Sequence, residues 1–145
     1  MLSNNLLTYS TLTLLVAIGG LQDFRKGEVS NWITVPLFVL GLAGLAARAF
    51  FSDDKAAAWL MIAIAVIHTL AVVKGWMGGA DWKILIALFG LWPAAGIAAV
   101  LGAAVWGVIA MTLTGKRKVR FPGVTAFAVA VALTYIAQVS IITGS

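Results

Sequence analysis

The stretch GWMGGADWKILIALFGLW, residues 75–92, decides how this sequence folds. After two glycines it enters a strongly apolar run, and that run opens with Asp81 and Lys83. A charged side chain is costly in apolar surroundings, so this pair needs an explanation. A short apolar segment between glycines and Pro93 is typical of a helix that begins among other helices, with irregular backbone facing a cavity or protein. We therefore predict a short helix at about residues 81–92 with a charged first turn.

The composition indicates a membrane protein. Of the 145 residues, 62% are hydrophobic and 10% are charged, and the mean hydropathy is +1.04. Soluble domains carry roughly a quarter charged residues, and so short a chain cannot bury this much apolar surface in one core. The formal net charge of +5 does not indicate nucleic-acid binding, because the positive residues cluster between apolar runs. The chain has no cysteine, so we expect neither disulfides nor a thiolate metal site.

Six segments are apolar enough to predict helices, and a spanning helix needs about 20 such residues. The predicted fold class is all-α: a polytopic membrane protein of about six transmembrane helices, forming one membrane domain over residues 1–145 without a soluble domain. Positive charges follow the first segment rather than precede it, so we expect a retained membrane helix instead of a cleaved signal peptide. The approximate segments are 4–22, 30–50, 56–74, 81–92, 94–114 and 121–142.

The positive residues predict the orientation. The loop after the second segment holds Arg48 and Lys55, the loop after the fourth holds none, and the other side carries the remaining eight. Positive loops stay in the cytoplasm, so both termini are expected outside, with Asp23 and Asp81 facing the cytoplasm. The basic run at residues 116–120 is expected to contact anionic lipid headgroups. The eight residues are Arg25, Lys26, Lys74, Lys83, Lys116, Arg117, Lys118 and Arg120.

Acidic residues are the candidates for chemistry. Asp53, Asp54 and Glu28 are expected to be solvated in loops. For Asp23, which directly follows the first segment, the alternative to a functional role is pairing with a neighbouring base at headgroup level. For Asp81 the alternative is a helix-capping carboxylate, with a nearby lysine reaching the interface.

The three residues before Asp81 have the smallest side chains: they are Gly78, Gly79 and Ala80. Small residues let another backbone come close to the carboxylate, as a site that admits a peptide requires. If Asp23 packs within a few ångströms of Asp81, the two titrate as a coupled pair. One then acts as base on a water molecule and the other gives a proton to the amide. The sequence does not assign which acid is the base, and the one indication is that the helix dipole favours the ionised form of Asp81.

The motif GGADWK, residues 78–83, resembles the Gly-x-Gly-Asp signature of membrane aspartyl peptidases. More narrowly, it is similar to that of the type IV prepilin peptidases, including their short Tad-type and archaeal preflagellin relatives. In that family a first aspartate at a cytoplasmic helix end precedes an asparagine that opens the next helix, as Asp23 precedes Asn31 here. The second aspartate is commonly followed by x-Lys, as Asp81 is followed by Lys83.

This resemblance implies an aspartic endopeptidase of the cell membrane, with its active site facing the cytoplasm and with neither cofactor nor metal. The catalytic pair would be Asp23 and Asp81, and Lys83 would orient or neutralise a carboxylate. The substrate would be a prepilin-like or preflagellin-like protein with a short basic leader ending in glycine before an apolar helix. The oligomeric state stays open. Residues implied to support substrate access are Gly78, Gly79, Ala80, Lys83 and Asn31.

The chain departs from the family pattern at three points. Ala80 replaces the second glycine of the motif. Ser30 stands where many relatives have proline before Asn31, and this change is expected to loosen the start of the second helix. The cysteine-containing domain that accompanies methylation in larger relatives is absent from this sequence, so we expect no methyltransferase domain.

Two other functions remain open. A small proton-coupled transporter or channel subunit would use Asp23 and Asp81 as proton sites, although neither acid lies near mid-membrane in the predicted topology. An assembly subunit would have no chemistry at all. His68, alone among apolar residues, is expected to be a hydrogen-bonded packing residue rather than a metal ligand. The tryptophans expected as interfacial anchors near the cytoplasmic boundary are Trp32, Trp76 and Trp82.

Overall fold

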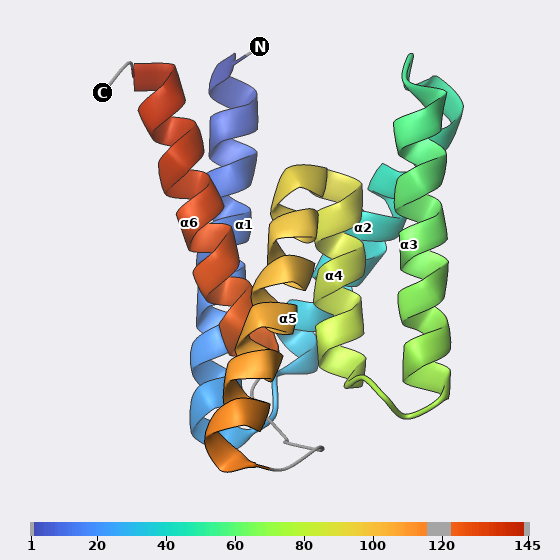
Figure 1. Cartoon of the computed structure of the whole chain (residues 1–145). Coiled ribbons are helices and arrows are strands. Elements are labelled where there is room, and N and C mark those ends of the chain that lie inside the picture. The colour runs from blue at the N-terminus through green and yellow to red at the C-terminus, as the bar shows by residue number, and fades with distance from the viewer. Residues whose placement is uncertain (1, 116–122, 144–145) are drawn as a thin grey trace.

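The computed structural model describes residues 2–115 and 123–143, with the backbone alone for 2–5 and 143. Within these ranges every regular element is a helix (Figure 1). The predicted basic run at 116–120 lies outside the described residues. The helices are α1 (Leu2–Lys26), α2 (Asn31–Phe51), α3 (Lys55–Val73), α4 (Gly79–Leu91), α5 (Pro93–Thr114) and α6 (Gly123–Thr143).

Four described helices, α2, α3, α5 and α6, are long and apolar enough to cross a membrane. Helix α4 has 13 residues and is roughly 20 Å long at about 1.5 Å per residue, short of a hydrocarbon core of about 30 Å. The chain is therefore an all-helical membrane protein, while six crossings stay a prediction. Both termini lie at one end of the molecule (Figure 1). Which side of the membrane that end faces also stays a prediction.

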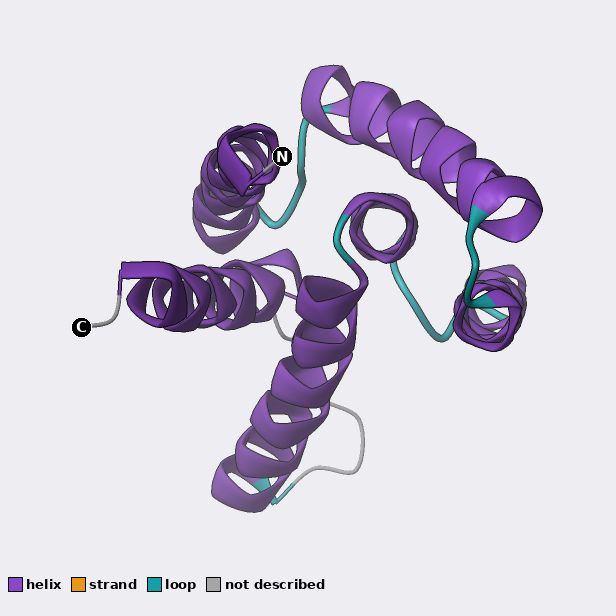
Figure 2. Ribbon diagram, turned by 90° about the horizontal axis from the view of Figure 1, so that it is seen from above, coloured by secondary structure: helices purple, strands orange, loops and turns teal. Residues whose placement is uncertain are grey.

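Helix α4 forms the centre of the structure. Seven consecutive residues, 84–90, are buried in it, so it is enclosed on all sides. Seen from above, it stands end-on with the other helices around it (Figure 2). It packs most extensively against α2 and also contacts α3, α5 and α6. The glycine- and proline-bounded segment of the sequence is thus the core helix, and its first turn is fixed from several directions.

Glycines allow α2 and α4 to touch along their backbones. A Cβ at Gly44 would lie 2.6 Å from the carbonyl oxygen of Gly90, and a Cβ at Gly90 would meet the backbone of Gly41. Small residues at such crossings let transmembrane helices pack closely. At the same end, Arg48 Nε donates to the carbonyl of Gly90 at 3.0 Å, and Lys55 Nζ donates to the carbonyl of Phe50 at 2.7 Å.

One of the three predicted interfacial tryptophans has a different role. Trp82 is only partly exposed, its Nε1 donates to Thr69 Oγ1 at 2.9 Å, and its ring lies 4.7 Å from that of Phe38. It therefore joins α2, α3 and α4, because the first turn of α4 lies among neighbouring helices. Trp32 and Trp76 are 90% and 82% exposed, as an interfacial position requires.

Helix α1 continues one turn further than predicted and ends at Lys26, before Gly27 with φ +67°. Its last turn therefore carries Asp23 instead of releasing it into a loop. Helices α1 and α6 pack side by side, and Thr125 Oγ1 donates to the carbonyl of Gly20 at 2.8 Å. This contact seats the start of α6 beside the end of α1.

Candidate active site

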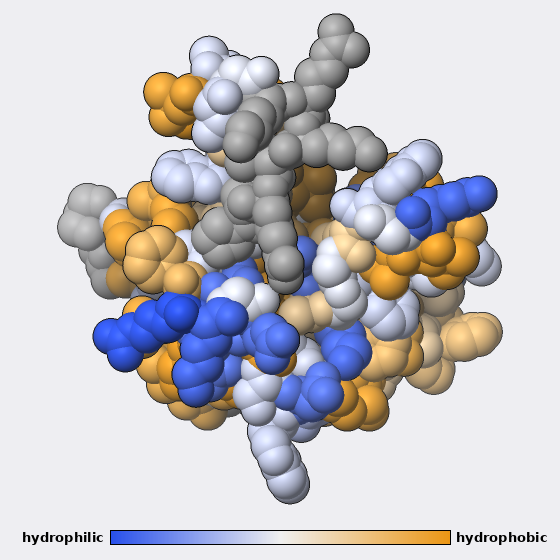
Figure 3. Space-filling model, turned by 90° about the horizontal axis from the view of Figure 1, so that it is seen from below, coloured by the Kyte–Doolittle hydropathy of each residue, from blue (hydrophilic) through white to orange (hydrophobic). Residues whose placement is uncertain are grey.

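A cleft of about 770 Å³ opens at the end of the molecule opposite the termini. Seen from below, hydrophilic side chains gather at this end while the flanks are apolar (Figure 3). Every site residue predicted from the sequence lines this cleft. They are Asp23, Asn31, Gly78, Gly79, Ala80, Asp81 and Lys83.

Asp23 caps a helix that follows it by 100 residues in the chain. Its Oδ2 accepts hydrogen bonds from the backbone N–H groups of Val124 at 3.0 Å and Thr125 at 3.4 Å, in the first turn of α6. The first N–H groups of a helix lack intrahelical partners, and the helix dipole is positive there, so this position favours a carboxylate. The alternative of a headgroup-level residue paired with its neighbours does not describe this contact.

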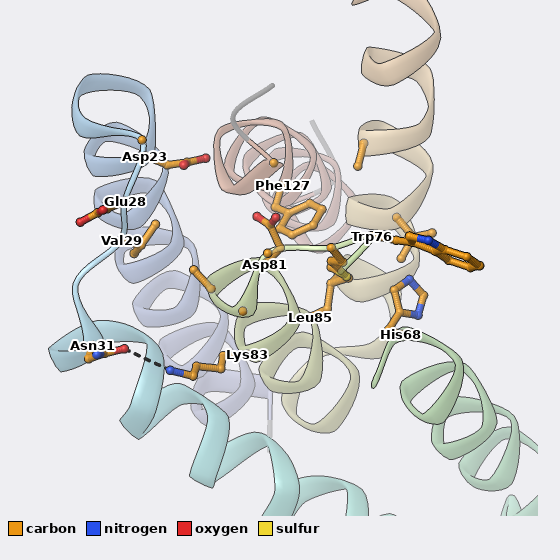
Figure 4. Close-up of a pocket in the computed structure, with 18 residues that line it drawn as sticks. Asp23, Glu28, Val29, Asn31, His68, Trp76, Asp81, Lys83, Leu85 and Phe127 are labelled. Atoms are coloured by element: carbon orange, nitrogen blue, oxygen red, sulfur yellow. Dashed lines mark hydrogen bonds between the residues drawn. The ribbon is translucent and has the colours of Figure 1, made fainter. Parts of the chain in front are cut away.

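Asp81 lies in the first turn of α4, two residues after the helix begins, with Gly78 as the N-cap. A Cβ placed on Gly78 would lie 2.9 Å from Asp81 Oδ2, and one placed on Gly123 would lie 2.6 Å from Asp81 Oδ1. The carboxyl group is thus held between two glycines, one before α4 and one opening α6. The carboxylates of Asp23 and Asp81 point toward the same space (Figure 4).

Burial, and then the negative charge of Asp23, raise the pKa of Asp81 from an ordinary 3.8 to about 6. The backbone N–H groups of Gly78 and Val124 act in the opposite direction without cancelling these effects. The dipole argument pointed to an ionised Asp81 as base, and the net shift has the opposite sign. Desolvation of a carboxylate outweighs a helix terminus here. Val124 N–H thus bonds Asp23 and also acts on Asp81, so one donor serves both acids.

The glycine motif has two separate functions in space. The slot at Gly78 is filled by the side chain of Asp81 itself, whereas a Cβ at Gly79 would meet nothing within 4 Å. Ala80 is partly buried against the core. Of the three small residues, Gly79 is the one that borders open space in the cleft.

Lys83 reaches across to α2. Its Nζ donates to Asn31 Oδ1 at 3.0 Å (Figure 4), so the hydrogen bond that the structure gives it is to an amide rather than to a carboxylate. Ser30 was expected to loosen the start of α2, and this is wrong. Its side chain accepts from the N–H of Trp32 at 3.3 Å as the N-cap, and its own N–H donates to Gln22 Oε1 at 3.0 Å. The serine therefore fixes the start of α2 to α1.

Two features of the cleft were not predicted as site residues. His68 of α3 lines the far wall; its Nδ1 is 2.8 Å from the carbonyl oxygen of Ile64, the hydrogen-bonded arrangement that was expected. The start of α6, with Gly123, contacts both acids, and the only local signal for it is the proline and glycine that follow the basic run. In the described part of the chain, no group of three His, Cys, Asp or Glu residues is arranged to hold a metal ion.

Comparison with known protein families relates the chain to a peptidase family. The model of the type IV leader peptidase family matches residues 10–143, which includes both acids and all six helices in whole or in part. No curated protein and no solved structure matches the chain.

Proposed function

The chain belongs to the type IV leader peptidase family, a family of membrane peptidases acting on prepilin-type proteins, and on that premise we propose that it is an aspartic endopeptidase. Asp23 and Asp81 would be its catalytic pair, cutting the leader from a pilin-like or preflagellin-like precursor at the cytoplasmic face of the membrane. One observation carries the proposal. Two acids from distant parts of the chain line one cleft, and both meet the first turn of α6: Val124 N–H donates to Asp23, and Gly123 lies against the carboxyl group of Asp81.

The two carboxyl groups differ in a way that suits hydrolysis. Asp23 accepts two hydrogen bonds from the first backbone N–H groups of α6, which hold its carboxyl group in place for the role of base. Asp81 keeps its proton to about pH 6 and is suited to act as acid. Pairs of carboxyls with different environments are the usual source of separate acid and base roles.

Hydrolysis of the peptide bond would take two steps, the attack of water and the collapse of the resulting diol. Asp23 takes a proton from a water molecule while the water oxygen bonds to the scissile carbonyl carbon, and Asp81 gives its proton to the carbonyl oxygen. The tetrahedral diol then collapses: Asp23 delivers its proton to the amide nitrogen, the C–N bond breaks, and a hydroxyl of the diol returns a proton to Asp81. The products are a new carboxyl end and a new amine, with both acids restored.

The walls of the cleft fit the expected substrate. Apart from His68, the wall beyond Asp81 includes apolar side chains, namely Leu85 from α4, Val100 and Ala103 from α5, and Phe127 from α6. Such a wall suits the apolar segment that follows the scissile bond. The open space beside Gly79 leaves room for substrate backbone next to the acids. Cleavage would then occur at the membrane surface, where the leader meets the apolar helix.

The test is cleavage, in detergent, of a peptide with a basic leader, glycine before the scissile bond and an apolar helix after it. Asp23→Asn and Asp81→Asn are compared with wild type and with Asp53→Asn, a matched change at an exposed acid. We expect wild type and the Asp53 variant to cut, and each site variant to lose at least about 1,000-fold in rate. Cleavage that survives either site variant overturns the pair, and a folded wild type that cuts no such peptide overturns the substrate class.

A further inference from the structure

The first residue of α6 lies directly against the carboxyl group of Asp81. A Cβ built on Gly123 would be 2.6 Å from Oδ1, 2.8 Å from Cγ and 2.9 Å from Oδ2 of that side chain. Real Cβ atoms do not approach other atoms this closely, and the atoms concerned are those that would carry out catalysis. Any larger residue at position 123 must therefore displace the carboxyl group.

The next two residues of α6 hold the other acid. The N–H groups of Val124 and Thr125 donate to Asp23 Oδ2. Three consecutive residues at one helix start thus contact Asp81 on one side and Asp23 on the other. Neither acid resides on α6, so this helix contacts both members of the pair without contributing a side chain to it.

The start of α6 is itself firmly seated. Val124 is 1% exposed, Thr125 Oγ1 donates to the carbonyl of Gly20, and a Cβ at Gly20 would lie 2.7 Å from that of Ala128. Because α6 is packed this closely against α1, the position of its first turn is fixed relative to Asp23. Asp81, which projects from α4 into the cleft, therefore lies against a first turn of α6 that is fixed in place.

We propose that Gly123, Val124 and Thr125 form the positioning element of the two acids. The missing side chain of Gly123 sets how closely Asp81 approaches Asp23, and the N–H groups of the next two residues hold Asp23 in place. This inference rests on the proposed function for its catalytic consequence, but its geometric content does not. Gly123 is a positioning residue and not a catalytic one, since it acts through Asp81.

The kinetic test compares Gly123→Ala with Gly19→Ala. The control adds the same methyl group one turn before Asp23, where its nearest neighbours lie at an ordinary 3.4 to 3.8 Å. A displacement of about 1 Å in a catalytic group can cost on the order of 100-fold. We expect Gly123→Ala to lower kcat by about that factor with KM within about twofold of wild type, and Gly19→Ala to stay within about threefold in both. Equal losses in the two variants overturn the inference.

The pH profile separates positioning from general damage. If Gly123 sets the approach of the two acids, the methyl group of Gly123→Ala separates the Asp81 carboxyl from the Asp23 charge, and the alkaline limb of kcat/KM should move to lower pH. In the described part of the cleft, the other titratable side chains are Glu28, His68 and Lys83; Lys83 is bound to Asn31, and His68 is at hydrogen-bond distance from Ile64. A lower rate with an unmoved alkaline limb contradicts the inference.

A stability cycle tests the contact without any substrate. Gly123→Ala is measured in wild type and in Asp81→Ala, where the carboxyl group that the methyl would strike is gone. We expect the melting temperature in detergent to fall by at least about 4 °C in wild type and by less than half of that in the Asp81→Ala background. Equal losses in both backgrounds overturn the inference even if the protein is a peptidase. A strong coupling in a protein that cuts no prepilin-like peptide supports the contact while rejecting the proposed substrate.

Discussion

Replacing Asp81 by asparagine should make the folded protein more stable at neutral pH while it abolishes cleavage. In the folded protein the pKa of Asp81 rises from 3.8 to about 6, chiefly through burial and next through the charge of Asp23. The folded state thus holds this proton more tightly than the unfolded chain. The contribution of this protonated group to the free energy of unfolding is complete below about pH 4 and is lost as the pH rises through about 6. Asparagine has no proton to lose, so the variant escapes this loss.

The size of the effect follows from the two pKa values. Each pKa unit corresponds to about 1.4 kcal/mol, so the difference is at most about 3 kcal/mol at pH 8. Asp81 keeps some contact with solvent, which weakens charge effects, and about 2 kcal/mol is the better expectation. For a chain of this length that is a rise in melting temperature of roughly 4 to 8 °C.

The assay is thermal unfolding in a mild detergent from pH 4 to pH 8, for wild type, Asp81→Asn and Asp53→Asn. The Asp53 variant makes the same chemical change at an exposed position and should match wild type at every pH. The stabilisation by Asp81→Asn should be near zero at pH 4 and grow to its full size by pH 8. A stabilisation that is absent at pH 8, or equally large at pH 4, would refute the idea that the buried charge of Asp81 destabilises the folded protein.

Three further predictions concern the cleft. Because Asp81 must keep its proton to act as acid, kcat/KM should fall about tenfold per pH unit above about 6, and a rate that rises from pH 6 to 8 would contradict that role. Lys83→Met should leave the pH profile in place and lower activity less than about tenfold, because the ammonium bonds Asn31; a profile displaced by a full pH unit would place the ammonium at the acids. Gly79→Ala should melt like wild type, since its Cβ meets nothing, yet raise KM if substrate backbone passes there; an unchanged KM would exclude that path.

Much of the helical fold follows from local sequence. All six described helices were predicted, and five of them match within about two residues at each end. The exception is α1, which runs to Lys26 because the helix ends at the left-handed Gly27 rather than at the first charge. That glycine after two basic residues is a helix-end signal, so the boundary was predictable in principle. Six crossings, by contrast, stay a prediction, since composition and length alone qualify four helices.

The site was only partly predictable, for physical reasons. Positive-residue counting placed Asp23 and Asp81 at the same end of the molecule, where the structure has them. Which acid is more strongly desolvated depends on packing, and local reasoning from the helix dipole therefore gave the wrong direction for the pKa of Asp81. Trp82 and Gly123 were likewise unpredictable, because their partners lie far away in the chain. Local sequence patterns predict where a charged residue lies on its helix, but not which distant helix end, such as the start of α6 here, packs against it.

Arg48 and Lys55 carry a consequence for how this protein could be engineered. In the predicted topology they are the two positive residues on the outer side of the membrane, so an attempt to strengthen that orientation would start by removing them. Each, however, supplies a donor to carbonyl groups where a helix ends, Arg48 to the end of α4 and Lys55 to the end of α2. Their positive charge weakens the charge difference that sets the orientation. Their hydrogen bonds, however, satisfy carbonyl groups in the last turns of helices, where intrahelical N–H donors are missing. Arg48→Gln should destabilise the protein less than Arg48→Ala, because glutamine removes the charge and keeps an N–H donor for the carbonyl of Gly90.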